Sequence, residues 1–382
     1  MKIDIVGAGP SGLFFAYLMK RDFPHYRIRI FEQNPAEATF GFGVVFSGRA
    51  LHYLSLGDAK LIERLSSRMQ KWDDQHIVKN NERVVIDGSS YAAIERLTLL
   101  RELREACGQL DIPIQYEQRI VDLDLFEDCD VLVGADGANS ILRDRYYDAF
   151  GTRVKDLGNF FAWYGVDHAY PAHTLTFKQN AEGTFCGHHY RYTPTRSTFV
   201  AEVDNATWYS SGMFEMSNED RQILFERLFE TTLGGQKLLN NRSNWKRYRL
   251  VENNRWHFGK VVLIGDALRT AHPSIGSGTR LAMEDAIALW YAFGQKKTNI
   301  ETLFSSYEAE RAPIRNKLNK AAAASIAWYE DMAAKMSMDI YRFAHDYAVR
   351  TGIMTVRRLA EESPQFSALY AERVGSQAAL SA

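Results

Sequence analysis

The sequence has 382 residues, of which 46% are hydrophobic and 24% are charged, and its formal net charge at pH 7 is −1. This length predicts a large core shared between two domains, and the near-zero charge argues against a nucleic acid or another polyanion held by bulk charge. No apolar run in the sequence is long enough for a membrane span, no signal peptide precedes the first predicted strand, and three scattered cysteines fit neither a disulfide framework nor a metal cluster. We therefore expect a cytoplasmic protein without a metal.

The first twelve residues predict a strand, a tight turn and the start of a helix. Apolar residues 3–6 are followed by G-A-G-P-S-G at Gly7–Gly12 and by an apolar stretch, 13–19, long enough for a helix. Glycines at G-x-G-x-x-G spacing let the backbone turn, leave room for a pyrophosphate and bring helix and strand close together. A second apolar run, 26–31, ends in Glu32, about 20 residues beyond the last glycine, where a carboxylate can bind the ribose of an adenosine. The pattern predicts a dinucleotide-binding unit, and the alternative is a glycine-rich turn in an ordinary α/β domain.

The next stretch mixes short strands and helices. F-G-F-G-V-V-F-S at Phe40–Ser47 predicts either a kinked strand or a backbone that a flat ligand approaches closely. Asn80-Asn81 predicts the turn of a hairpin. In chain order we expect a helix over 51–69, strands over 75–79 and 82–86, a helix over 92–109, and strands over 114–116 and 120–125. Asp130–Gly134 predicts a buried strand before Asp136-Gly137, which places a carboxylate at the sheet edge where ligands gather.

From residue 160 the pattern changes to alternating, aromatic-rich segments separated by turns. They predict an antiparallel sheet with strands over 160–168, 174–179, 184–192 and 197–203. A helix is expected over 216–233, with Asn218 as its cap. A buried strand over 259–264 ends in Gly265-Asp266, and a glycine-spaced loop over 271–279 precedes a helix over 281–293, whose N-terminus can bind an anion. Residues 303–359 are expected to be mostly helical.

Three motifs in this order resemble those of the single-component FAD-dependent aromatic hydroxylases, which have the p-hydroxybenzoate hydroxylase fold. They are G-A-G-P-S-G at Gly7–Gly12, G-A-D-G-A-N-S at Gly134–Ser140, and G-D-A-L at Gly265–Leu268 followed by H-P-S-I-G-S-G-T. Two further stretches, Phe40–Ser47 and Ser274–Ala286, look like the salicyloyl-CoA and anthraniloyl-CoA monooxygenases. They also resemble, less closely, the hydroxylase of a tryptophan-derived pigment in violacein synthesis.

The resemblance implies an α/β (α+β) fold with a Rossmann-like FAD-binding domain, an inserted antiparallel β-sheet substrate domain and C-terminal helices. The FAD-binding domain is expected to be discontinuous, over residues 1–70, 90–158 and 255–310. The substrate domain is expected over 71–89 and 159–254, and the C-terminal helical region over 311–382. We expect a monomer or a homodimer.

The resemblance also implies where FAD binds. The pyrophosphate would lie on the glycine motif and reach Arg96, the adenosine ribose would meet Glu32, and the ribityl chain would meet Asp266. The full set of expected cofactor-binding residues is Gly7, Gly9, Pro10, Ser11, Gly12, Glu32, Gln33, Gly43, Val44, Val45, Arg96, Asp136, Asp266, Gly276, Ser277, Gly278 and Thr279. FAD is expected to bind non-covalently, and NAD(P)H is expected to be a transient co-substrate because the sequence has no second dinucleotide-binding motif.

The implied activity is the hydroxylation of an amino- or hydroxy-substituted aromatic ring by a flavin C4a-hydroperoxide formed with O₂. An aryl-CoA thioester stands ahead of a free aromatic acid or an indole compound as the expected substrate, and Arg49, Arg191 and Arg196 are available for the phosphates of CoA. The catalytic candidates are His272, just before the flavin loop, and His188 and Tyr190, which share one face of a strand. Each of the three can equally be a structural residue.

Three other functions would use the first motif. A non-catalytic FAD- or NAD-binding module would not consume NAD(P)H in response to an aromatic ligand, and a flavin oxidase should turn over without NAD(P)H. A flavin halogenase needs an additional W-x-W-x-I-P motif and a lysine, and the sequence contains no such run.

Overall fold

A six-stranded sheet, here called the cofactor sheet, holds the N-terminal strand near its centre. The computed structural model describes residues 1–39, 41–276, 278–295 and 299–380. The strand order of the cofactor sheet is β16 (His257–Phe258), β17 (Val261–Leu263), β9 (Val131–Gly134), β1 (Lys2–Val6), β2 (Arg27–Phe31) and β8 (Ile114–Gln115). All neighbouring pairs are parallel except β16 with β17. The carboxyl ends of the parallel strands therefore meet at one edge, as the predicted Rossmann-like arrangement requires.

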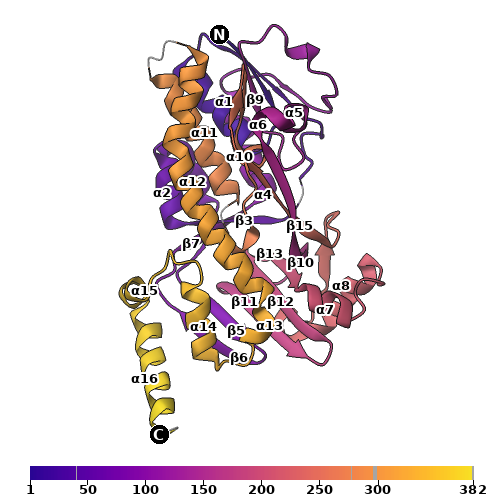
Figure 1. Cartoon of the computed structure of the whole chain (residues 1–382), viewed down its shortest axis with the longest axis vertical. Coiled ribbons are helices and arrows are strands. Elements are labelled where there is room, and N and C mark those ends of the chain that lie inside the picture. The colour runs from indigo at the N-terminus through magenta and orange to yellow at the C-terminus, as the bar shows by residue number, and fades with distance from the viewer. Residues whose placement is uncertain (40, 277, 296–298, 381–382) are drawn as a thin grey trace.

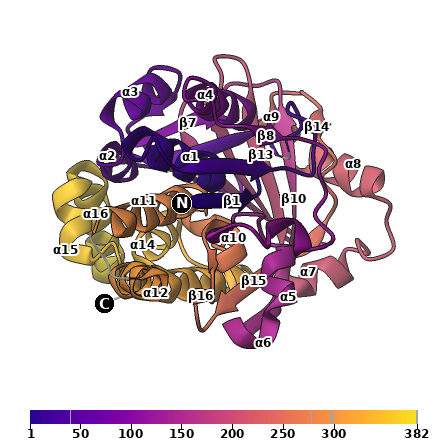
Figure 2. The same ribbon diagram turned by 90° about the horizontal axis from the view of Figure 1, so that it is seen from above.

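Apolar helices cover the cofactor sheet and bury its core. The principal ones are α1 (Pro10–Asp22), α4 (Arg96–Gly108), α11 (Gly278–Gly294) and the long α12 (Ile300–Glu330). Leu13, Phe14 and Phe15 of α1 are fully buried in the same cluster as the sheet residues Ile5 and Val133. Seen from above, α3 (Ala59–Ser67) and α4 lie at one rim of the molecule, and α6 (Tyr147–Phe150) and α12 at the opposite rim (Figure 2).

The predicted antiparallel strands form an eight-stranded sheet, here called the large sheet. Its order is β14 (Leu238–Asn240), β10 (Thr152–Val166), β13 (Ser197–Val203), β12 (Gly183–Arg191), β11 (His173–Asn180), β5 (Gln75–Lys79) and β6 (Glu82–Ile86), with β15 (Lys246–Asn253) also paired to β10. The hairpin predicted at Asn80-Asn81 is confirmed, and Asn80 has the positive φ of 53° that a tight turn uses. The pairing of β5 with β11 is parallel, so the sheet is not purely antiparallel.

A three-stranded sheet joins the two larger ones, and it corrects one prediction. It contains β3 (Gly43–Ser47), β7 (Tyr91–Glu95) and β4 (Gln70–Trp72). The helix expected over 92–109 begins only at Arg96, because Ala92, Ala93 and Ile94 are buried between β3 and β4 as a strand. Gly43 fixes β3 to the large sheet: its N–H donates to Thr198 Oγ1 at 2.9 Å, and its carbonyl accepts from Tyr190 Oη at 3.0 Å.

Three other predicted elements differ in detail. The helix expected over 51–69 is two helices, α2 (Gly48–Ser55) and α3, because Asp58 between them caps α3 by accepting from Leu61 N–H. The strand expected over 120–125 is absent from the described residues, and a 3₁₀ turn occupies Asp124–Phe126. The cap of α8 (Asn218–Leu228) is Ser217, which forms a capping box with Asp220, and Asn218 is the first helical residue. The remaining short helices are α5 (Ile141–Arg145), α7 (Asn205–Ser210), α9 (Glu230–Leu233) and α10 (Gly265–Leu268).

The C-terminal helices pack against one face of the large sheet. They are α13 (Met332–Lys335), α14 (Ile340–Val349), α15 (Val356–Glu362) and α16 (Pro364–Leu380), which follow α12 in the chain. Phe177 of β11 lies among the rings of Trp328, Tyr329 and Phe343 in this interface. Figure 1 shows α12 running from the cofactor sheet to the large sheet. No helix in the described part of the chain is long and apolar enough to cross a membrane.

Candidate cofactor and substrate site

The three glycines of the first motif have different surroundings. A Cβ on Gly7, where φ is +107°, would lie 2.3 Å from the carbonyl oxygen of Ala135, and a Cβ on Gly12 would lie 2.1 Å from the carbonyl oxygen of Gly7. These two positions are glycine because the turn and the helix pack closely. A Cβ on Gly9 would meet nothing nearer than the Ala135 oxygen at 4.0 Å. Gly9 therefore leaves open space in front of the backbone, as a bound pyrophosphate requires.

The start of α1 presents its N-terminus to this open space. Gly9 is the N-cap residue without a side-chain cap, and Pro10 is at the first helical position. N–H groups in the first turn of a helix have no partner within the helix, so they and the helix dipole favour an anion here. Ser11 brings the third motif, Gly265–Leu268, to the same place, because a Cβ on Gly265 would lie 2.8 Å from Ser11 Oγ.

Glu32 is held at the end of β2 by three donors. Its carboxylate accepts from Ala8 N–H at 2.9 Å, from Asn34 N–H at 2.9 Å and from Asn34 Nδ2 at 2.7 Å. The side chain is half-buried beside the glycine motif, which is consistent with a role at the adenosine ribose, whereas Gln33 is exposed. The sequence alone did not indicate that Glu32 also fixes Ala8 of the glycine turn.

Arg96 and Asp266 are charged groups without a protein partner among the described residues. Arg96 begins α4, Asp266 lies in α10, and neither side chain has a hydrogen bond or an ion pair there. Burial lowers the pKa of Arg96 and raises the pKa of Asp266, and each charge opposes the shift of the other. A guanidinium and a carboxylate left unpartnered beside an open glycine cradle fit FAD, whose phosphates and ribityl hydroxyls could satisfy both.

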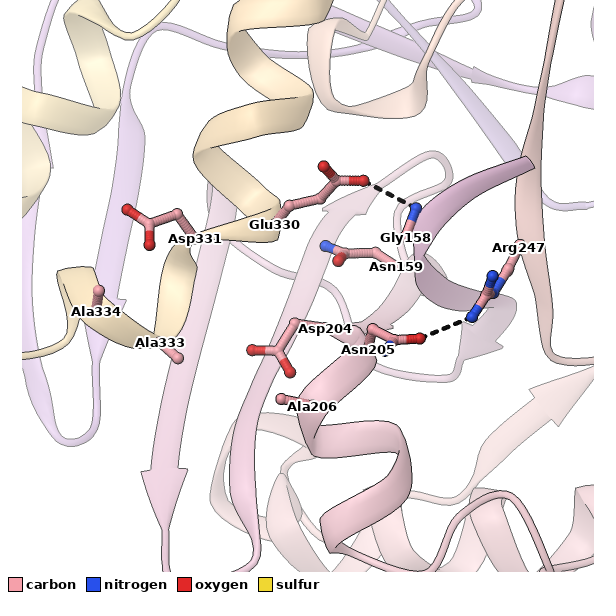
Figure 3. A pocket seen from close by; sticks show the side chains of 10 residues that line it. All are labelled: Gly158, Asn159, Asp204, Asn205, Ala206, Arg247, Glu330, Asp331, Ala333 and Ala334. Carbon is pink, nitrogen blue, oxygen red and sulfur yellow. Dashed lines mark hydrogen bonds between the residues drawn. The ribbon is translucent and has the colours of Figure 1, made fainter. Parts of the chain in front are cut away.

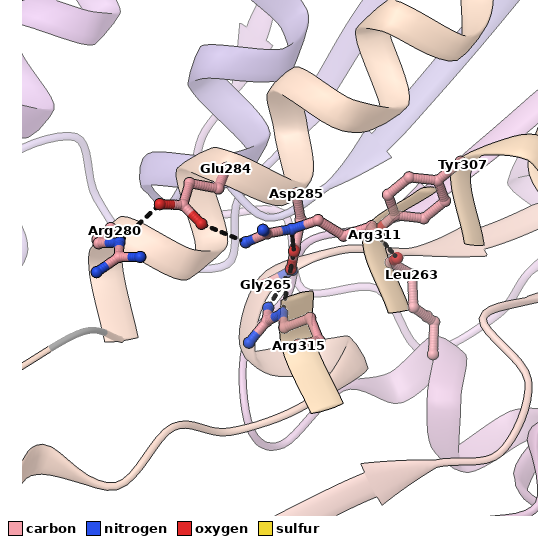
Figure 4. Close-up of polar contacts among 8 residues, drawn as sticks. All are labelled: Leu263, Gly265, Arg280, Glu284, Asp285, Tyr307, Arg311 and Arg315. Atoms are coloured by element: carbon pink, nitrogen blue, oxygen red, sulfur yellow. Dashed lines mark hydrogen bonds and ion pairs between the residues drawn. The ribbon is translucent and has the colours of Figure 1, made fainter. Parts of the chain in front are cut away.

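A buried ion cluster on α11 and α12 supports the Gly265–Leu268 motif (Figure 4). Asp285 accepts from Arg311 Nε at 2.9 Å, from Arg315 Nε at 3.0 Å and from the N–H of Gly265 at 3.1 Å. Glu284 bridges Arg311 Nη2 and Arg280 Nε, each at 2.6 Å. The cluster fixes the backbone amide that precedes Asp266. Sequence reasoning missed it, although Arg311 and Arg315 stand four residues apart on one helix, a spacing that places them on one face.

The predicted flavin loop lies between β3 and the C-terminal helices. A Cβ on Gly276, which has a φ of +57°, would contact Val45 Cγ1 at 3.4 Å, so this loop and β3 approach each other as predicted. Gly278 and Thr279 form the first turn of α11. Ser277 lies outside the described residues, as does Phe40 of the β3 motif.

Asp136 and Gly137 lie at the carboxyl end of the cofactor sheet. Asp136 Oδ2 accepts from Ile141 N–H at 2.8 Å, and burial raises the pKa of this carboxyl group. Its Oδ1 is buried and has no partner among the described residues. The carboxylate thus fixes the turn into α5.

The three catalytic candidates have different hydrogen-bond partners. Tyr190 donates to the Gly43 carbonyl, and burial raises its pKa to about 12, so the phenol serves to fix β3. His188 Nε2 lies 2.9 Å from Glu202 Oε2, and Glu202 Oε1 accepts from Asn159 Nδ2 at 2.8 Å. His272 and Glu202 line one narrow cavity, so the structure brings both histidine candidates to the same carboxylate.

Two ring residues missed by the sequence analysis lie beside Tyr190. His173 of β11 has its ring centroid 5.8 Å from that of Tyr190 and 5.3 Å from that of Tyr91. Burial lowers the pKa of His173 to about 3, so its imidazole is neutral. With Trp72, whose ring stacks on Tyr190 at 6.4 Å, these residues form an aromatic wall next to β3. Trp72 lies on β4 and Tyr91 on β7, and neither was among the predicted site residues.

A pocket of about 610 Å³ is lined in part by Asn159, the residue whose side chain donates to Glu202 (Figure 3). Asn159 and Glu330 line both this pocket and the narrow cavity that holds Glu202 and His272. Glu330 accepts from Gly158 N–H at 2.8 Å, and Arg247 donates to Asn205 at 2.7 Å. In the described part of the chain, no group of three or more His, Cys, Asp or Glu side chains is arranged to hold a metal.

Comparisons with known proteins agree with this geometry. Residues 126–322 match the family model described as an FAD binding domain, and residues 5–37 match an NAD(P)-binding Rossmann-like domain. The chain belongs to the FAD-dependent aromatic monooxygenases.

Three curated relatives are similar over most of the chain. It is 35% identical to a salicyloyl-CoA 5-hydroxylase of a Streptomyces species over 86% of this chain and 65% of that protein, so it spans about two thirds of that relative. It is 33% identical to the 3-hydroxy-4-methyl-anthranilyl-[aryl-carrier protein] 5-monooxygenase of Streptosporangium sibiricum, over 95% of this chain and 97% of that protein. It is 31% identical to the protodeoxyviolaceinate monooxygenase of Chromobacterium violaceum, over 92% and 94%.

Solved structures show the same fold. The tetrameric form of 2-methyl-3-hydroxypyridine-5-carboxylic acid oxygenase superposes with a TM-score of 0.70 at 17% identity, over 94% of this chain and 95% of that one. PqsL of Pseudomonas aeruginosa in complex with 2-aminobenzoylacetate gives a TM-score of 0.68 at 18% identity, over 87% and 97%. The mixed α/β fold with a Rossmann-like sheet, a second sheet and C-terminal helices is thereby confirmed.

Proposed function

We propose that this protein binds one FAD non-covalently and uses NAD(P)H and O₂ to hydroxylate an amino- or hydroxy-substituted aromatic ring carried as a thioester. The observation that supports the cofactor is the open cradle at Gly9 beside the unpartnered Arg96 and Asp266. The thioester is supported by two relatives, whose names specify a salicyloyl-CoA and an anthranilyl group on an aryl-carrier protein. In both names the ring carries a hydroxyl or an amino group next to the acyl carbon.

Different residues of this chain would bind different parts of FAD. The N-terminus of α1 and Arg96 would bind the pyrophosphate, Glu32 the adenosine ribose and Asp266 the ribityl hydroxyls. The loop at Gly276–Thr279 and β3 would enclose the flavin ring. Bound FAD, reduced by NAD(P)H, would supply the activated oxygen, and the protein would exclude water and aim the substrate ring.

The His188–Glu202 pair is the group best placed to hold a proton from the substrate. Glu202 is buried, which by itself raises its pKa, but hydrogen bonds from His188 and Asn159 lower the pKa below the ordinary value. Glu202 therefore stays ionised and accepts a hydrogen bond from His188 Nε2. A ring hydroxyl or amino group that gives up its proton to His188 becomes more electron-rich, which favours attack by an electrophilic oxygen.

The arginines considered for CoA phosphates already have partners in the protein. Arg49 pairs with Glu362 at 2.7 Å, Arg196 pairs with Asp167 at 2.7 Å, and Arg191 donates to three backbone carbonyls. This observation favours a second candidate substrate, a free aromatic acid or a tryptophan-derived indole, as does the similarity to the protodeoxyviolaceinate monooxygenase.

A substrate screen tests the proposal. The FAD-loaded protein is mixed with NADH or NADPH and, in parallel, with salicyloyl-CoA, anthraniloyl-CoA, a carrier-bound aryl thioester, the free acids and indoles. We expect the thioesters to accelerate NAD(P)H oxidation and to yield a product with one added oxygen atom. If only a free aromatic does both, the thioester is wrong. If no compound does either, the proposed substrate classes are wrong.

A further inference from the structure

The imidazole of His272 is held by donors on one side of the ring. The backbone N–H of Ser274 donates to His272 Nδ1 at 3.3 Å, and Ser274 Oγ lies 2.8 Å from the same nitrogen. A backbone N–H can only donate, so Nδ1 must be an acceptor and cannot carry a proton. His272 is only 5% exposed, and burial lowers its pKa to about 4. The neutral ring therefore carries its proton on Nε2.

A directed chain of hydrogen bonds continues from this nitrogen into the C-terminal helices. Ser274 Oγ lies 2.8 Å from Ser325 Oγ of α12, and Arg350 Nε donates to Ser325 Oγ at 3.0 Å. Because the Ser274 N–H makes Nδ1 an acceptor, the single hydroxyl proton of Ser274 goes to His272 Nδ1, and Ser274 Oγ in turn accepts from Ser325. Ser325 accepts from Arg350, whose guanidinium can only donate. Ser325 is fully buried, so water does not compete for its hydroxyl group.

Arg350 also holds the loop itself. Its Nη2 donates to the Ser274 carbonyl at 2.8 Å, and its Nη1 donates to the Tyr347 carbonyl at the end of α14 at 2.7 Å. The guanidinium lies 3.7 Å from the centroid of the Tyr347 ring, which fixes its plane. One side chain from the C-terminal helices thus fastens both the backbone and the hydroxyl group of the predicted flavin loop.

We propose that Arg350 is a positioning residue that locks His272 as a neutral Nε2–H donor, and that His272 therefore acts in the site as a hydrogen-bond donor and not as a general base. A base would need a free nitrogen lone pair facing its proton, and the only such nitrogen, Nδ1, is occupied by Ser274. The atom that His272 meets on a ligand must then be an acceptor, such as a carbonyl or a phenolate oxygen. The tautomer of His272 follows from these hydrogen bonds alone, whereas the role of His272 as a donor to a ligand rests on the proposed function.

The tautomer can be measured without any turnover. The protein has ten histidines, so selective ¹⁵N-histidine labelling gives a tractable set of ring signals, and His272 is assigned by the signal lost in His272→Gln. At pH 7 we expect the pattern of a neutral ring protonated on Nε2. In Arg350→Gln, which releases the Ser274 backbone whose N–H donates to Nδ1, we expect averaging between the two tautomers. In Ser325→Ala, which removes the hydroxyl group beside Ser274 Oγ, we expect the same averaging to a smaller extent. Arg358→Gln removes a guanidinium that pairs with Glu362 on α15 and should leave the His272 signal unchanged.

Two outcomes would contradict the proposal that Arg350 holds His272 as the Nε2–H tautomer. One is a His272 ring that is charged or protonated on Nδ1 in the unsubstituted protein. The other is a His272 signal that neither Arg350→Gln nor Ser325→Ala changes. The donor role has its own test once a substrate is known. Glutamine can accept from Ser274 N–H and donate from its amide nitrogen but cannot act as a base, so His272→Gln should keep coupled product formation within about tenfold, whereas loss of a general base costs about 100-fold or more. His272→Phe, which cannot donate, should lose coupling, and equal large losses in both variants would contradict the donor role.

Discussion

At the scale of single residues, the glycine motif combines two separate demands. Gly7 and Gly12 are required by the packing of the protein itself, because a Cβ at either position would collide with a backbone oxygen. Gly9 faces open space, so the packing of the protein does not require a glycine at this position. Substitutions at Gly9 and Gly12 should therefore separate cofactor binding from folding.

The first prediction uses this contrast. Gly9→Val should leave the melting temperature of the FAD-free protein nearly unchanged while abolishing FAD binding, because the new side chain fills only the ligand space. Gly12→Ala should destabilise the FAD-free protein by about 1 to 3 kcal/mol, because its Cβ must displace the Gly7 carbonyl. Thermal unfolding and FAD titration measure the two effects. Equal destabilisation by both substitutions would contradict the assignment of Gly9.

The second prediction concerns Asp266. Replacing it by asparagine removes the negative charge but keeps the shape, so FAD affinity should fall by roughly tenfold to a hundredfold, the value of one charge-assisted hydrogen bond of about 1.5 to 3 kcal/mol. Asp148→Asn on the exposed helix α6 is the matched control and should change nothing. Full FAD occupancy of purified Asp266→Asn would show that this carboxylate does not hold the cofactor.

At the scale of elements, α11 and α12 are joined by buried charges and not by apolar side chains alone. Asp285 is fully buried between Arg311 and Arg315, each 1% exposed. Removing one member of such a group leaves an uncompensated charge in the core. The cluster also holds the amide of Gly265, so disrupting the cluster should also disturb the Gly265–Leu268 motif.

The third prediction follows from this cluster. Arg315→Met should lower the free energy of unfolding by about 3 to 5 kcal/mol, because the Asp285 charge is left buried without full compensation. Arg280→Met is the matched control on the rim of the same cluster, where the arginine side chain is 23% exposed, and its cost should be about 1 kcal/mol or less. Urea unfolding measures both. If Arg280→Met lowered the free energy of unfolding as much as Arg315→Met does, burial of the charge would not explain the effect of Arg315→Met.

The elements also show how far the sequence could predict the structure. The strand–turn–helix unit, the hairpin and the strands of the large sheet follow from local periodicity and turn residues, and they are confirmed. Strand β7 was predicted as helix because Ala92–Glu95 has no local strand signal and becomes a strand only by pairing with β3 and β4. The Asp285 cluster and the Arg350–His272 chain join residues far apart in the sequence, so no local pattern could reveal them.

At the scale of the whole molecule, the large sheet is joined both to the three-stranded sheet and to a long helix that covers the cofactor sheet. Gly43 is bonded to Thr198 and Tyr190 across the gap between β3 and the large sheet. Helix α12, with 31 residues, is about 46 Å long; it binds Asp285 from the middle of its length and the N–H of Gly158 at its end. The two sheets are thereby expected to unfold together.

The fourth prediction concerns the pH dependence of this global stability. Burial lowers the pKa of His272 from its ordinary value of 6.5 to about 4 in the folded protein, so the unfolded chain binds an extra proton between these two values. Stability should therefore be full above pH 6.5 and fall as the pH drops toward 4. At pH 5 this histidine alone should cost about 2 kcal/mol relative to neutral pH. In urea unfolding, His272→Gln should reduce the difference in the free energy of unfolding between pH 7 and pH 5 by that amount. An unchanged difference would contradict a neutral, buried imidazole.

The strand order of the cofactor sheet also sets a timetable for biosynthesis. Strand β1 leaves the ribosome first, but its neighbour β9 ends at Gly134, and β17, on the far side of β9, begins at Val261. At a synthesis rate of about 5 to 20 residues per second, roughly ten to fifty seconds pass between the synthesis of β1 and that of β17, and only then can the sheet be completed. During that time Leu13, Phe14 and Phe15, which the finished protein buries completely, have no lasting cover. The growing chain should therefore depend on chaperones, and nascent chains stalled before residue 261 should remain bound to them.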